Sequence, residues 1–255
     1  MAAMTKLSVN LNKVALLRNQ RDYGIPSVVA AARVCIEAGA YGITVHPRPD
    51  QRHITPRDVD DLVKLLTEHP GVEFNIEGNP FEGKWLAIVE RVRPAQATLV
   101  PDSPDQRTSD HGWDMAADAR RLAPIIKRLR GAGIRVSVFM DPDVEQIARV
   151  PAVGADRIEL YTESYATAFR QGDYAATLDR YVRAAVKADE LGLGINAGHD
   201  LNLKNLGPFC KAIAAALPAG RGVLEVSIGH EITGDALFMG LANAVKAYLR
   251  VLSQD

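Results

Sequence analysis

Residues Gly42 to Ile54 read GITVHPRPDQRHI, an alternating strand that ends in a loop broken by prolines. Ile43 and Val45 fall on one face of this strand and Thr44 and His46 on the other, because successive side chains of a strand point to opposite sides. Two prolines follow, and a central strand excludes proline because it cannot donate to the ladder. The pattern predicts a short strand that delivers a histidine to a loop.

That loop carries Arg48, Arg52 and His53 within six residues. Guanidinium groups form forked, charge-assisted hydrogen bonds with phosphate, and histidine exchanges protons near neutral pH. The loop therefore favours an anionic, phosphorylated ligand. A basic loop that only contacts solvent is the alternative, and no motif here is specific enough to decide between them.

The rest of the chain repeats a strand followed by a helix, without a linker or a shift in composition. Eight such units predict a single-domain (β/α)8 TIM barrel over residues 1–255, and a doubly wound open sheet is the alternative. The expected strands are Leu7–Asn10, Gly42–His46, Val72–Ile76, Ala97–Val100, Arg135–Met140, Ile158–Leu160, Ile195–Asn196 and Leu224–Ile228. The expected helices are Ser27–Ala38, Asp58–Leu66, Phe81–Val92, Met115–Arg130, Asp143–Val150, Tyr174–Leu191, Lys204–Leu217 and Ala236–Leu252, with a basic turn over Lys13–Arg21 and a loop over Tyr161–Asp173.

Several of these strands alternate polar and apolar side chains, although strands of a parallel sheet covered on both faces usually read as apolar runs. A closed barrel explains the alternation, because one face of each strand packs on the helices and the other fills the lumen. The side chains expected in the lumen are Ser8, Asn10, Thr44, His46, Asn75, Glu77, Arg157, Glu159, Glu225 and Ser227.

The overall composition is that of an ordinary globular protein. The 30 basic and 31 acidic residues give a net charge of -1, so bulk charge offers no reason to expect nucleic acid or an anionic membrane as a partner. The two cysteines, Cys35 and Cys210, fall in apolar helical patterns and indicate neither a disulfide framework nor a metal site. No apolar run approaches the roughly 18–20 residues of a membrane span, so we expect a cytoplasmic protein.

Polar side chains gather where the expected strands end, which is where barrel enzymes place their active sites. Four of the six histidines fall in or just after such ends, and only His69 and His111 lie elsewhere. For any single residue, a capping or buried structural role is the alternative. The strand-end residues are Asn10, His46, Glu77, Asp141, Glu159, His199 and His230.

Two other chemistries have weak support. Only Lys13 lies near a strand end, so a Schiff-base aldolase is disfavoured. The chain has no His-x-His pair and no His-Glu-x-x-His helix, which weakens a metallohydrolase, although ligands from separate strands can still converge.

Several motifs together resemble the pyridoxine 5'-phosphate synthase family of vitamin B6 biosynthesis. They are Asn10 with the later Leu-Arg-Asn, Gly-Ile-Thr-Val-His with Arg-His-Ile-Thr, Asn-Ala-Gly-His and Ile-Gly-His, and the resemblance extends from Leu7 to about Leu249. It implies a barrel enzyme that condenses 3-amino-2-oxopropyl phosphate with 1-deoxy-D-xylulose 5-phosphate to pyridoxine 5'-phosphate, phosphate and water. It also implies no metal or redox cofactor, and a homo-oligomer, typically an octamer.

Carried over by position, the resemblance assigns roles to individual residues. His46 and Glu77 would accept protons, His199 would donate one, and Glu159 would stabilise a transition state. The aminoketone phosphate would be held by Asn10, Arg21, Gly229 and His230, and the pentulose phosphate by Arg48, His53 and Thr108.

Three positions depart from the family pattern. Asn12-Lys13 replaces Asp-His, Asp200 replaces Gly, and Tyr161 stands where His is usual. We hypothesise that Lys13 contacts the pentulose phosphate, with Asn12 hydrogen-bonded to a sugar hydroxyl. Asp200 fits beside an anion only if its backbone N–H points at the phosphate and its carboxylate turns away or caps the next helix.

A further expectation follows from the sequence. The polar loop Asp102–Gly112 has the composition of a lid, and we expect it to close over the pentulose phosphate.

The competing functions are another phosphosugar lyase or isomerase on the same barrel, and a phosphometabolite-binding protein without activity. A binding protein would need the arginines to hold phosphate. It would not need His46, Glu77 and His199, three groups that transfer protons, to lie together.

Overall fold

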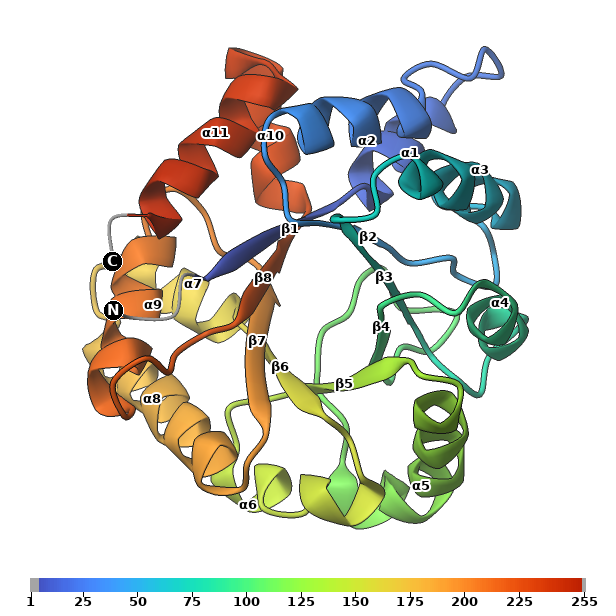
Figure 1. Cartoon of the computed structure of the whole chain (residues 1–255). Helices are drawn as coiled ribbons and strands as arrows, with labels where there is room; N and C mark the ends of the chain where they lie inside the picture. The colour runs from blue at the N-terminus through green and yellow to red at the C-terminus, as the bar shows by residue number, and fades with distance from the viewer. Residues whose placement is uncertain (1–4, 254–255) are drawn as a thin grey trace.

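A computed structural model describes residues 5–253 and shows eight parallel strands that close into a barrel in chain order, with β1 paired to β8 (Figure 1). The expected TIM barrel is confirmed. The strands are β1 (Lys6–Asn10), β2 (Gly42–Val45), β3 (Glu73–Gly78), β4 (Gln96–Leu99), β5 (Arg135–Met140), β6 (Arg157–Tyr161), β7 (Gly194–His199) and β8 (Glu225–Ile228).

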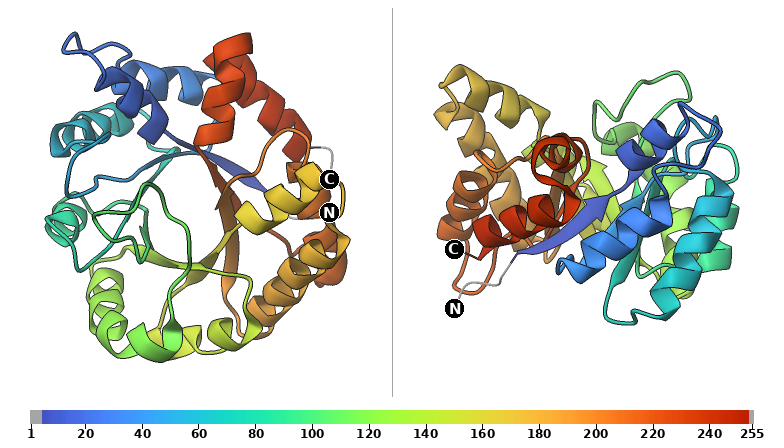
Figure 2. Two further views of the ribbon diagram at one scale, coloured as in Figure 1. Left: turned by 180° about the vertical axis from the view of Figure 1, so that it is seen from behind. Right: turned by 90° about the horizontal axis from the view of Figure 1, so that it is seen from above.

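Helices form a ring around these strands, as the views from behind and above also show (Figure 2). They are α1 (Asn12–Arg18), α2 (Val28–Glu37), α3 (Pro56–Thr67), α4 (Trp85–Val92), α5 (Met115–Gly131), α6 (Val144–Ile147), α7 (Glu163–Gln171), α8 (Ala175–Glu190), α9 (Leu206–Ala216), α10 (His230–Met239) and α11 (Leu241–Leu252), with a 3-10 turn at Val150–Val153. No helix within residues 5–253 combines the length and apolar character that crossing a bilayer requires.

The expected alternation of the strands is confirmed by the contacts inside the barrel. The hydroxyls of Ser8 and Thr44 are hydrogen-bonded across β1 and β2 (2.7 Å), and the Asn75 amide donates to the Thr44 hydroxyl (3.4 Å). The Thr98 hydroxyl in turn donates to Asn75 (3.1 Å). The other face of each strand is apolar and fully buried against the helices. The lumen is therefore polar, and the hydrophobic core lies between barrel and helices.

An ion cluster closes the end of the lumen where the strands begin. Arg135 donates to Glu73 (3.3 Å), and Arg157 lies 3.5 Å from the carboxylate of Glu225. Gln96 also donates to Glu225 (3.5 Å). All five are the first residues of their strands. With charged groups paired at this end, the lumen is left open at the carboxyl ends of the strands.

The expected helix start at Ser27 is confirmed, and the helix expected from Asp58 begins at Pro56, with Thr55 as its N-cap. The Ser27 hydroxyl accepts from the backbone N–H of Ala30, as an N-cap does. Thr55 and Asp58 cap each other's backbone N–H groups in a capping box at the start of α3. This box fixes the end of the loop that carries the basic residues after β2.

Several expected boundaries were wrong, among them the start of α4, which begins at Trp85 rather than at Phe81. The basic turn over Lys13–Arg21 contains the helix α1, because good helix formers there bury Val14 and Ala15. The expected loop over Tyr161–Asp173 contains α7, and β7 is six residues long rather than two. The last expected helix begins earlier and is broken into α10 and α11 at Gly240, whose φ of 79° suits glycine.

Candidate functional site

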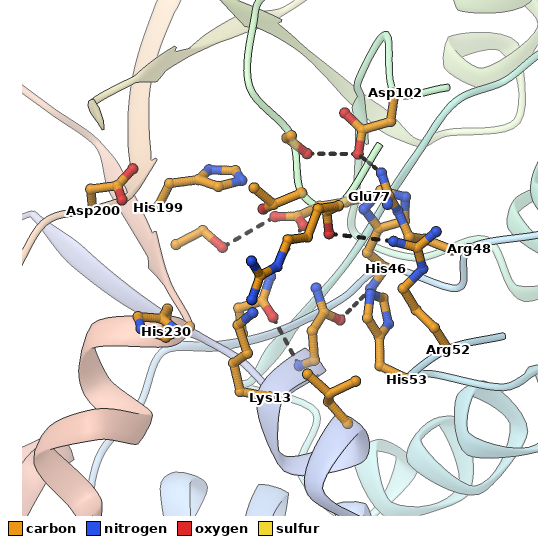
Figure 3. A pocket seen from close by; sticks show the side chains of 18 of the residues that line it. Lys13, His46, Arg48, Arg52, His53, Glu77, Asp102, His199, Asp200 and His230 are labelled. Carbon is orange, nitrogen blue, oxygen red and sulfur yellow. Dashed lines mark hydrogen bonds and ion pairs between the residues drawn. The ribbon is translucent and has the colours of Figure 1, made fainter. Parts of the chain in front are cut away.

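A cavity of about 550 Å³ opens at the carboxyl ends of the strands (Figure 3). Its walls come from β1, β3, β6, β7 and β8, from α1 and the start of α10, and from the loops that follow β2, β4 and β7. The lining residues singled out from the sequence are Asn10, Asn12, Lys13, His46, Arg48, His53, Glu77, Thr108, His199, Asp200, Gly229 and His230. The remaining lining residues are Leu16, Arg52, Asp102, Arg107, Ser109, Tyr161 and Ser227.

Three other strand-end or site expectations lie outside this lining. Arg21 is exposed just after α1 and does not line the cavity of its own chain. Glu159 is buried in the lumen. Asp141 accepts from the backbone N–H of Gly112 (3.2 Å), so its carboxylate holds the loop before α5.

Glu77 lies at the floor of the cavity, 3% exposed. Its carboxylate accepts from the Asn10 amide (3.1 Å) and from the Ser227 hydroxyl (3.3 Å). Burial, and then the negative charge of Asp102, raise the pKa of Glu77 to about 8, and the two donors oppose this rise only in part. A carboxyl with a pKa near neutral pH is suited to general acid–base catalysis.

Glu159 lies in the same lumen, against the backbone of Gly198, where an added Cβ would come within 2.8 Å of its Oε1. The Thr98 hydroxyl is near enough to favour the ionised form slightly, but it donates its proton to Asn75. Neither carboxyl oxygen of Glu159 has a hydrogen-bond partner within residues 5–253. Burial, and then the charge of Glu77, raise the pKa of Glu159 well above its usual range.

His46 and His53 face each other at the basic side of the cavity, with ring centroids 6.1 Å apart. Burial lowers the pKa of both imidazoles to about 3, aided by Arg48 beside His46 and by His46 beside His53. Both rings are therefore neutral at neutral pH. The backbone N–H of Ile54 donates to Nδ1 of His53 (2.9 Å), which places the proton of the neutral ring on Nε2.

His199 ends β7 in a left-handed conformation, with φ 69°. Its ring packs against Phe139 (centroids 4.9 Å apart) and meets Tyr161 edge-on (5.7 Å). Burial lowers its pKa to about 4. Strained residues held in place by their surroundings often mark functional sites. The aromatic pair fixes the imidazole at the cavity wall, so Tyr161 contributes to the site through its contact with His199.

Asn10 and Asn12 link the first strand to the second. The Asn10 side chain accepts from the backbone N–H of Asn12 (2.9 Å), and the Asn12 side chain accepts from the backbone N–H of His46 (2.9 Å). The side-chain oxygen Oδ1 of Asn12 thus binds the backbone just after β2. The N–H groups of its side-chain amide remain available to a sugar hydroxyl. The hypothesis for Asn12 is narrowed to a donor role.

Asp200 lines the cavity, but the conditions set for it beside an anion are not met. Its backbone N–H donates to the carbonyl of Gly198 (3.1 Å) and to the Thr162 hydroxyl (3.3 Å) rather than into the cavity. Its side chain does not cap α9, whose N-cap residue is Asn205. Burial, then the charges of Glu163 and Glu231, raise its pKa to about 6. With this pKa the carboxylate is still mostly ionised at neutral pH, so Asp200 keeps a negative charge on this side of the cavity.

Gly229 and His230 mark the start of α10, six residues earlier than expected from the sequence. The first backbone N–H groups of a helix have no partner within it, so they can bind phosphate. An added Cβ on Gly229 would lie 3.1 Å from the Asn10 side chain. Glycine at this position therefore keeps Asn10 and the helix start together at one edge of the cavity.

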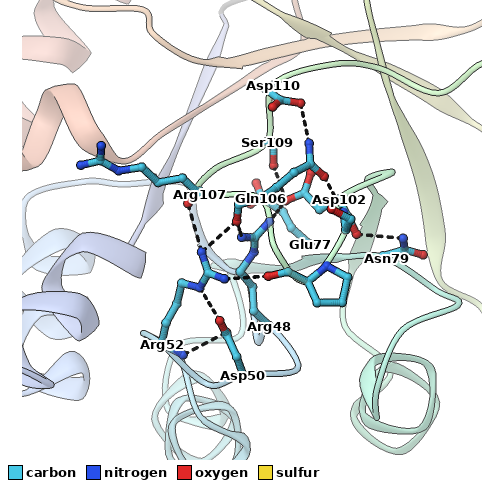
Figure 4. A network of polar contacts seen from close by, with 12 residues as sticks. Arg48, Asp50, Arg52, Glu77, Asn79, Asp102, Gln106, Arg107, Ser109 and Asp110 are labelled. Atoms are coloured by element: carbon cyan, nitrogen blue, oxygen red, sulfur yellow. Dashed lines mark hydrogen bonds and ion pairs between the residues drawn. The ribbon is translucent and has the colours of Figure 1, made fainter.

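The loop Asp102–Gly112 lies across the barrel mouth in the rear view (Figure 2, left) and is held there by two arginines (Figure 4). Arg48 is 5% exposed, forms an ion pair with Asp102 and donates to the carbonyl of Gln106. Asp102 also accepts from the Ser109 hydroxyl (2.8 Å). Arg52 donates to the carbonyls of Pro104 and Gln106 (2.8 Å each). The loop lacks apolar anchors, as expected, and polar contacts hold it in place; whether it moves as a lid stays a prediction.

Sequence reasoning did not single out Asp102, Arg107, Ser109 or Ser227 as site residues, although the first three lie in the loop expected to close over the pentulose phosphate. Ser227 was placed in the lumen by its parity, and Asp102 lies three residues beyond the end of β4, so a strand-end rule extended to the start of each loop could have found both. Arg107 and Ser109 lie in an irregular loop whose path no periodicity predicts. Within residues 5–253, no group of three or more His, Cys, Asp or Glu side chains could hold a metal ion.

Solved structures share the fold at low sequence identity. The 3-keto-L-gulonate-6-phosphate decarboxylase from Vibrio cholerae aligns with a TM-score of 0.65 and 11% identity over 99% of both chains. The YdjI aldolase from Escherichia coli K12 aligns with a TM-score of 0.60 and 11% identity over 98% of this chain and 90% of its own. At this identity the likeness supports the barrel alone.

Relatives in sequence are much closer. The protein named pyridoxine 5'-phosphate synthase from Albidiferax ferrireducens is 53% identical over 254 residues, 98% of each chain. The protein of the same name from Porphyromonas gingivalis is 50% identical over 245 residues, 96% of this chain and 98% of its own. The family described as "Pyridoxal phosphate biosynthesis protein PdxJ" matches residues 7–254. The chain therefore belongs to the PdxJ family of pyridoxal phosphate biosynthesis proteins.

Proposed function

We propose that this protein is a pyridoxine 5'-phosphate synthase. It condenses 3-amino-2-oxopropyl phosphate with 1-deoxy-D-xylulose 5-phosphate and releases phosphate and water, working in the cytoplasm as a homo-oligomer. The relatives that share half of its sequence carry this name. The observation that carries the proposal is the convergence of His46, Glu77 and His199 on one cavity.

The chemistry requires repeated proton transfer, because imine formation, dehydration, phosphate loss and ring closure each move protons. A carboxyl with a pKa of about 8 can hold a proton and release it in the same cycle, so Glu77 is the central acid–base group. His46 is neutral at neutral pH and can accept a proton. Glu159, whose pKa burial raises well above its usual range, stabilises charge that develops at the end of the lumen.

His199 must gain a proton before it can donate one, because its pKa of about 4 leaves the ring neutral in the empty site. Two substrate phosphates would bring negative charge into the cavity, and nearby negative charge raises the pKa of an imidazole. The proposal therefore has His199 take up a proton when substrates bind or in an earlier step, and donate it to a leaving hydroxyl afterwards.

The two phosphates are assigned to opposite sides of the cavity. The aminoketone phosphate lies at the start of α10, against Gly229, His230 and Asn10, where unpaired backbone N–H groups are available. The pentulose phosphate lies on the basic side, near His53 and Thr108, with Arg48 released from the carbonyl of Gln106 to meet it. Both assignments keep the reacting carbon atoms above Glu77.

A second copy of the chain is proposed to cover an apolar surface beside α1 and α10. Tyr23 and Ile25 are 75% and 72% exposed after α1, and Leu237 and Phe238 are 73% and 93% exposed on α10. Large apolar side chains exposed to this extent mark interaction surfaces. Arg21 lies on this surface, so it is kept as a phosphate ligand only in the assembled form. Phe238→Asp should dissociate the assembly, as light scattering during gel filtration would report.

Product formation tests the proposal directly. The purified protein is incubated with both substrates, and pyridoxine 5'-phosphate is followed by its absorbance. Consumption of either substrate alone, without product, would favour another phosphosugar lyase or isomerase. Binding of both substrates with neither consumed would favour a binding protein and refute the proposal.

A further inference from the structure

Four lysine and arginine side chains line the cavity, and only two of them are paired. Arg48 is bound to Asp102 and Gln106, and Arg52 is bound to Asp50 (2.5 Å) and to loop carbonyls. The side chains of Lys13 and Arg107 make no ion pair and no hydrogen bond within the described residues 5–253. Two cations of this cavity are therefore available to a ligand.

These two cations come from different elements and face the same space. Lys13 is on α1 and projects into the cavity (Figure 3), and its side chain is half-buried. Arg107 is on the β4–α5 loop, where Arg52 donates to its carbonyl (3.4 Å), and its side chain points away from the Arg48–Arg52 network (Figure 4). The loop contacts thus fix the backbone of Arg107 and leave its guanidinium free.

The position of α1 is also fixed. Arg18 at its end donates to Asp58 (2.9 Å) and to the carbonyl of His53 (3.0 Å). The Asn19 amide also donates to the carbonyl of His53 (2.9 Å). The backbone segments that carry Lys13 and Arg107 are therefore each held in place by other contacts. These contacts keep the two cations near each other.

Like charges held in a partly buried cavity repel each other, and this repulsion is visible at Lys13. Burial and then the positive charge of Arg107 lower the pKa of the Lys13 ammonium. An anion between the two groups converts their repulsion into attraction to a common partner. Guanidinium can bind two phosphate oxygens as a fork, and an ammonium meets a third as a point charge.

We propose that Lys13 and Arg107 together grip the phosphate of one substrate from opposite sides, one from α1 and the other from the β4–α5 loop. The assignment of this phosphate to the pentulose rests on the proposed function. Thr108, the neighbour of Arg107, and His53 line the same side of the cavity. Asp200 and Glu231 give the opposite side, around the start of α10, a negative character that disfavours a second strongly basic site there.

The grip distinguishes the two phosphates by charge. The site at α10 offers backbone N–H groups beside acidic side chains, whereas the site at Lys13 and Arg107 offers two full positive charges. A phosphate monoester dianion is therefore held more strongly on the pentulose side. The loop contributes one of the two cations, so a bound phosphate also holds the loop against α1.

The test uses inorganic phosphate as the probe and the full-length chain. Isothermal titration compares wild type with Lys13→Met and Arg107→Met, and with the controls Arg120→Met and Lys127→Met on the exposed face of α5. We expect each of the first two variants to weaken one phosphate site about tenfold, and Lys13→Arg to restore most of the affinity. The controls should stay within about twofold of wild type.

The rate of lysine acylation provides a second measurement of phosphate binding, which does not depend on catalysis. Phosphate should protect Lys13 from acetic anhydride, and Arg107→Met should shift the pH dependence of its acylation upwards, because a repelling charge has been removed. With both substrates, Lys13→Met and Arg107→Met should raise the Michaelis constant for the pentulose phosphate about tenfold and leave that for the aminoketone nearly unchanged.

Phosphate affinity of Arg107→Met equal to that of Arg120→Met, or an unprotected Lys13, would overturn the inference. Normal product formation together with either result would refute the phosphate grip alone. Absence of product, with phosphate binding still lost in both variants, would refute the synthase and leave the grip intact.

Discussion

Replacing Glu77 by Gln should stabilise the protein and inactivate it at the same time. The amide fits the same contacts, because its carbonyl oxygen can accept from Asn10 and its N–H₂ group can donate to the Ser227 hydroxyl, which also accepts. The change removes the ability to ionise and little else. The two measurable effects, on stability and on turnover, therefore have one cause.

The size of the stability effect follows from the pKa of Glu77. Burial raises that pKa from an ordinary value of 4.5 to about 8. Each pKa unit corresponds to about 1.36 kcal/mol, so ionising Glu77 in the folded chain costs about 5 kcal/mol more than in the unfolded chain. Water and side-chain relaxation around the site reduce this cost. We therefore expect Glu77→Gln to raise the free energy of unfolding by about 3 kcal/mol above pH 8.

The sign of the pH dependence is fixed by which state holds the proton. The unfolded chain loses the proton of Glu77 near pH 4.5, and the folded chain keeps it to about pH 8. The contribution of Glu77 to the free energy of unfolding of the wild type is therefore greatest below about pH 4.5, and it is lost as the pH rises to about 8. The variant lacks this loss, so its advantage should be absent at pH 4.5, grow through this window and level off above it.

Thermal unfolding at pH 4.5, 7 and 9 measures the advantage, and product absorbance measures turnover. A gain of about 3 kcal/mol corresponds to roughly 6–12 °C in Tm for a domain of this size. Turnover should fall at least about a hundredfold. Glu37→Gln, an exposed change on α2, is the control and should alter neither. A Tm difference that is the same at all three pH values, or turnover within tenfold of wild type, would refute the reasoning.

Three further predictions concern the same site. His199→Asn should lower turnover at least about a hundredfold with little change in substrate binding, and unchanged turnover would remove His199 from the mechanism. Exhaustive EDTA treatment should leave activity intact, and a loss that zinc restores would revive a metal-dependent reaction. Proteolysis within Asp102–Gly112 should slow when pentulose phosphate binds and quicken in Arg52→Met, which loses the contacts to Pro104 and Gln106; equal rates in all three states would contradict the lid.

The barrel and its polar lumen could be predicted because period-two alternation records which face of a strand is buried. Thr44 and Asn75, placed in the lumen from parity, are hydrogen-bonded there. The helix α1 could not be predicted from charge alone. Lys13 and Arg18 suggested a turn, but a helix forms here because it buries Val14. Tertiary packing thus overrode the local signal.

The candidate site divides in the same way. Residues at strand ends, such as His46, Glu77 and His199, could be found because closure of the barrel brings all strand ends together. Arg21 is set by the path of an exposed segment, and Arg107 by contacts between Arg52 and a distant loop. Such contacts depend on the three-dimensional path of the chain, which no spacing in the sequence records.

The hydrogen bonds of Arg48 and Arg52 to the β4–α5 loop have a kinetic consequence. We predict that these donors must release the loop carbonyls before the substrate can bind, so that molecules with the loop in place predominate before binding. Only the open fraction can capture substrate, and the observed association rate constant is reduced by that fraction. At high pentulose phosphate concentration, the capture rate should approach a plateau equal to the rate at which the loop opens.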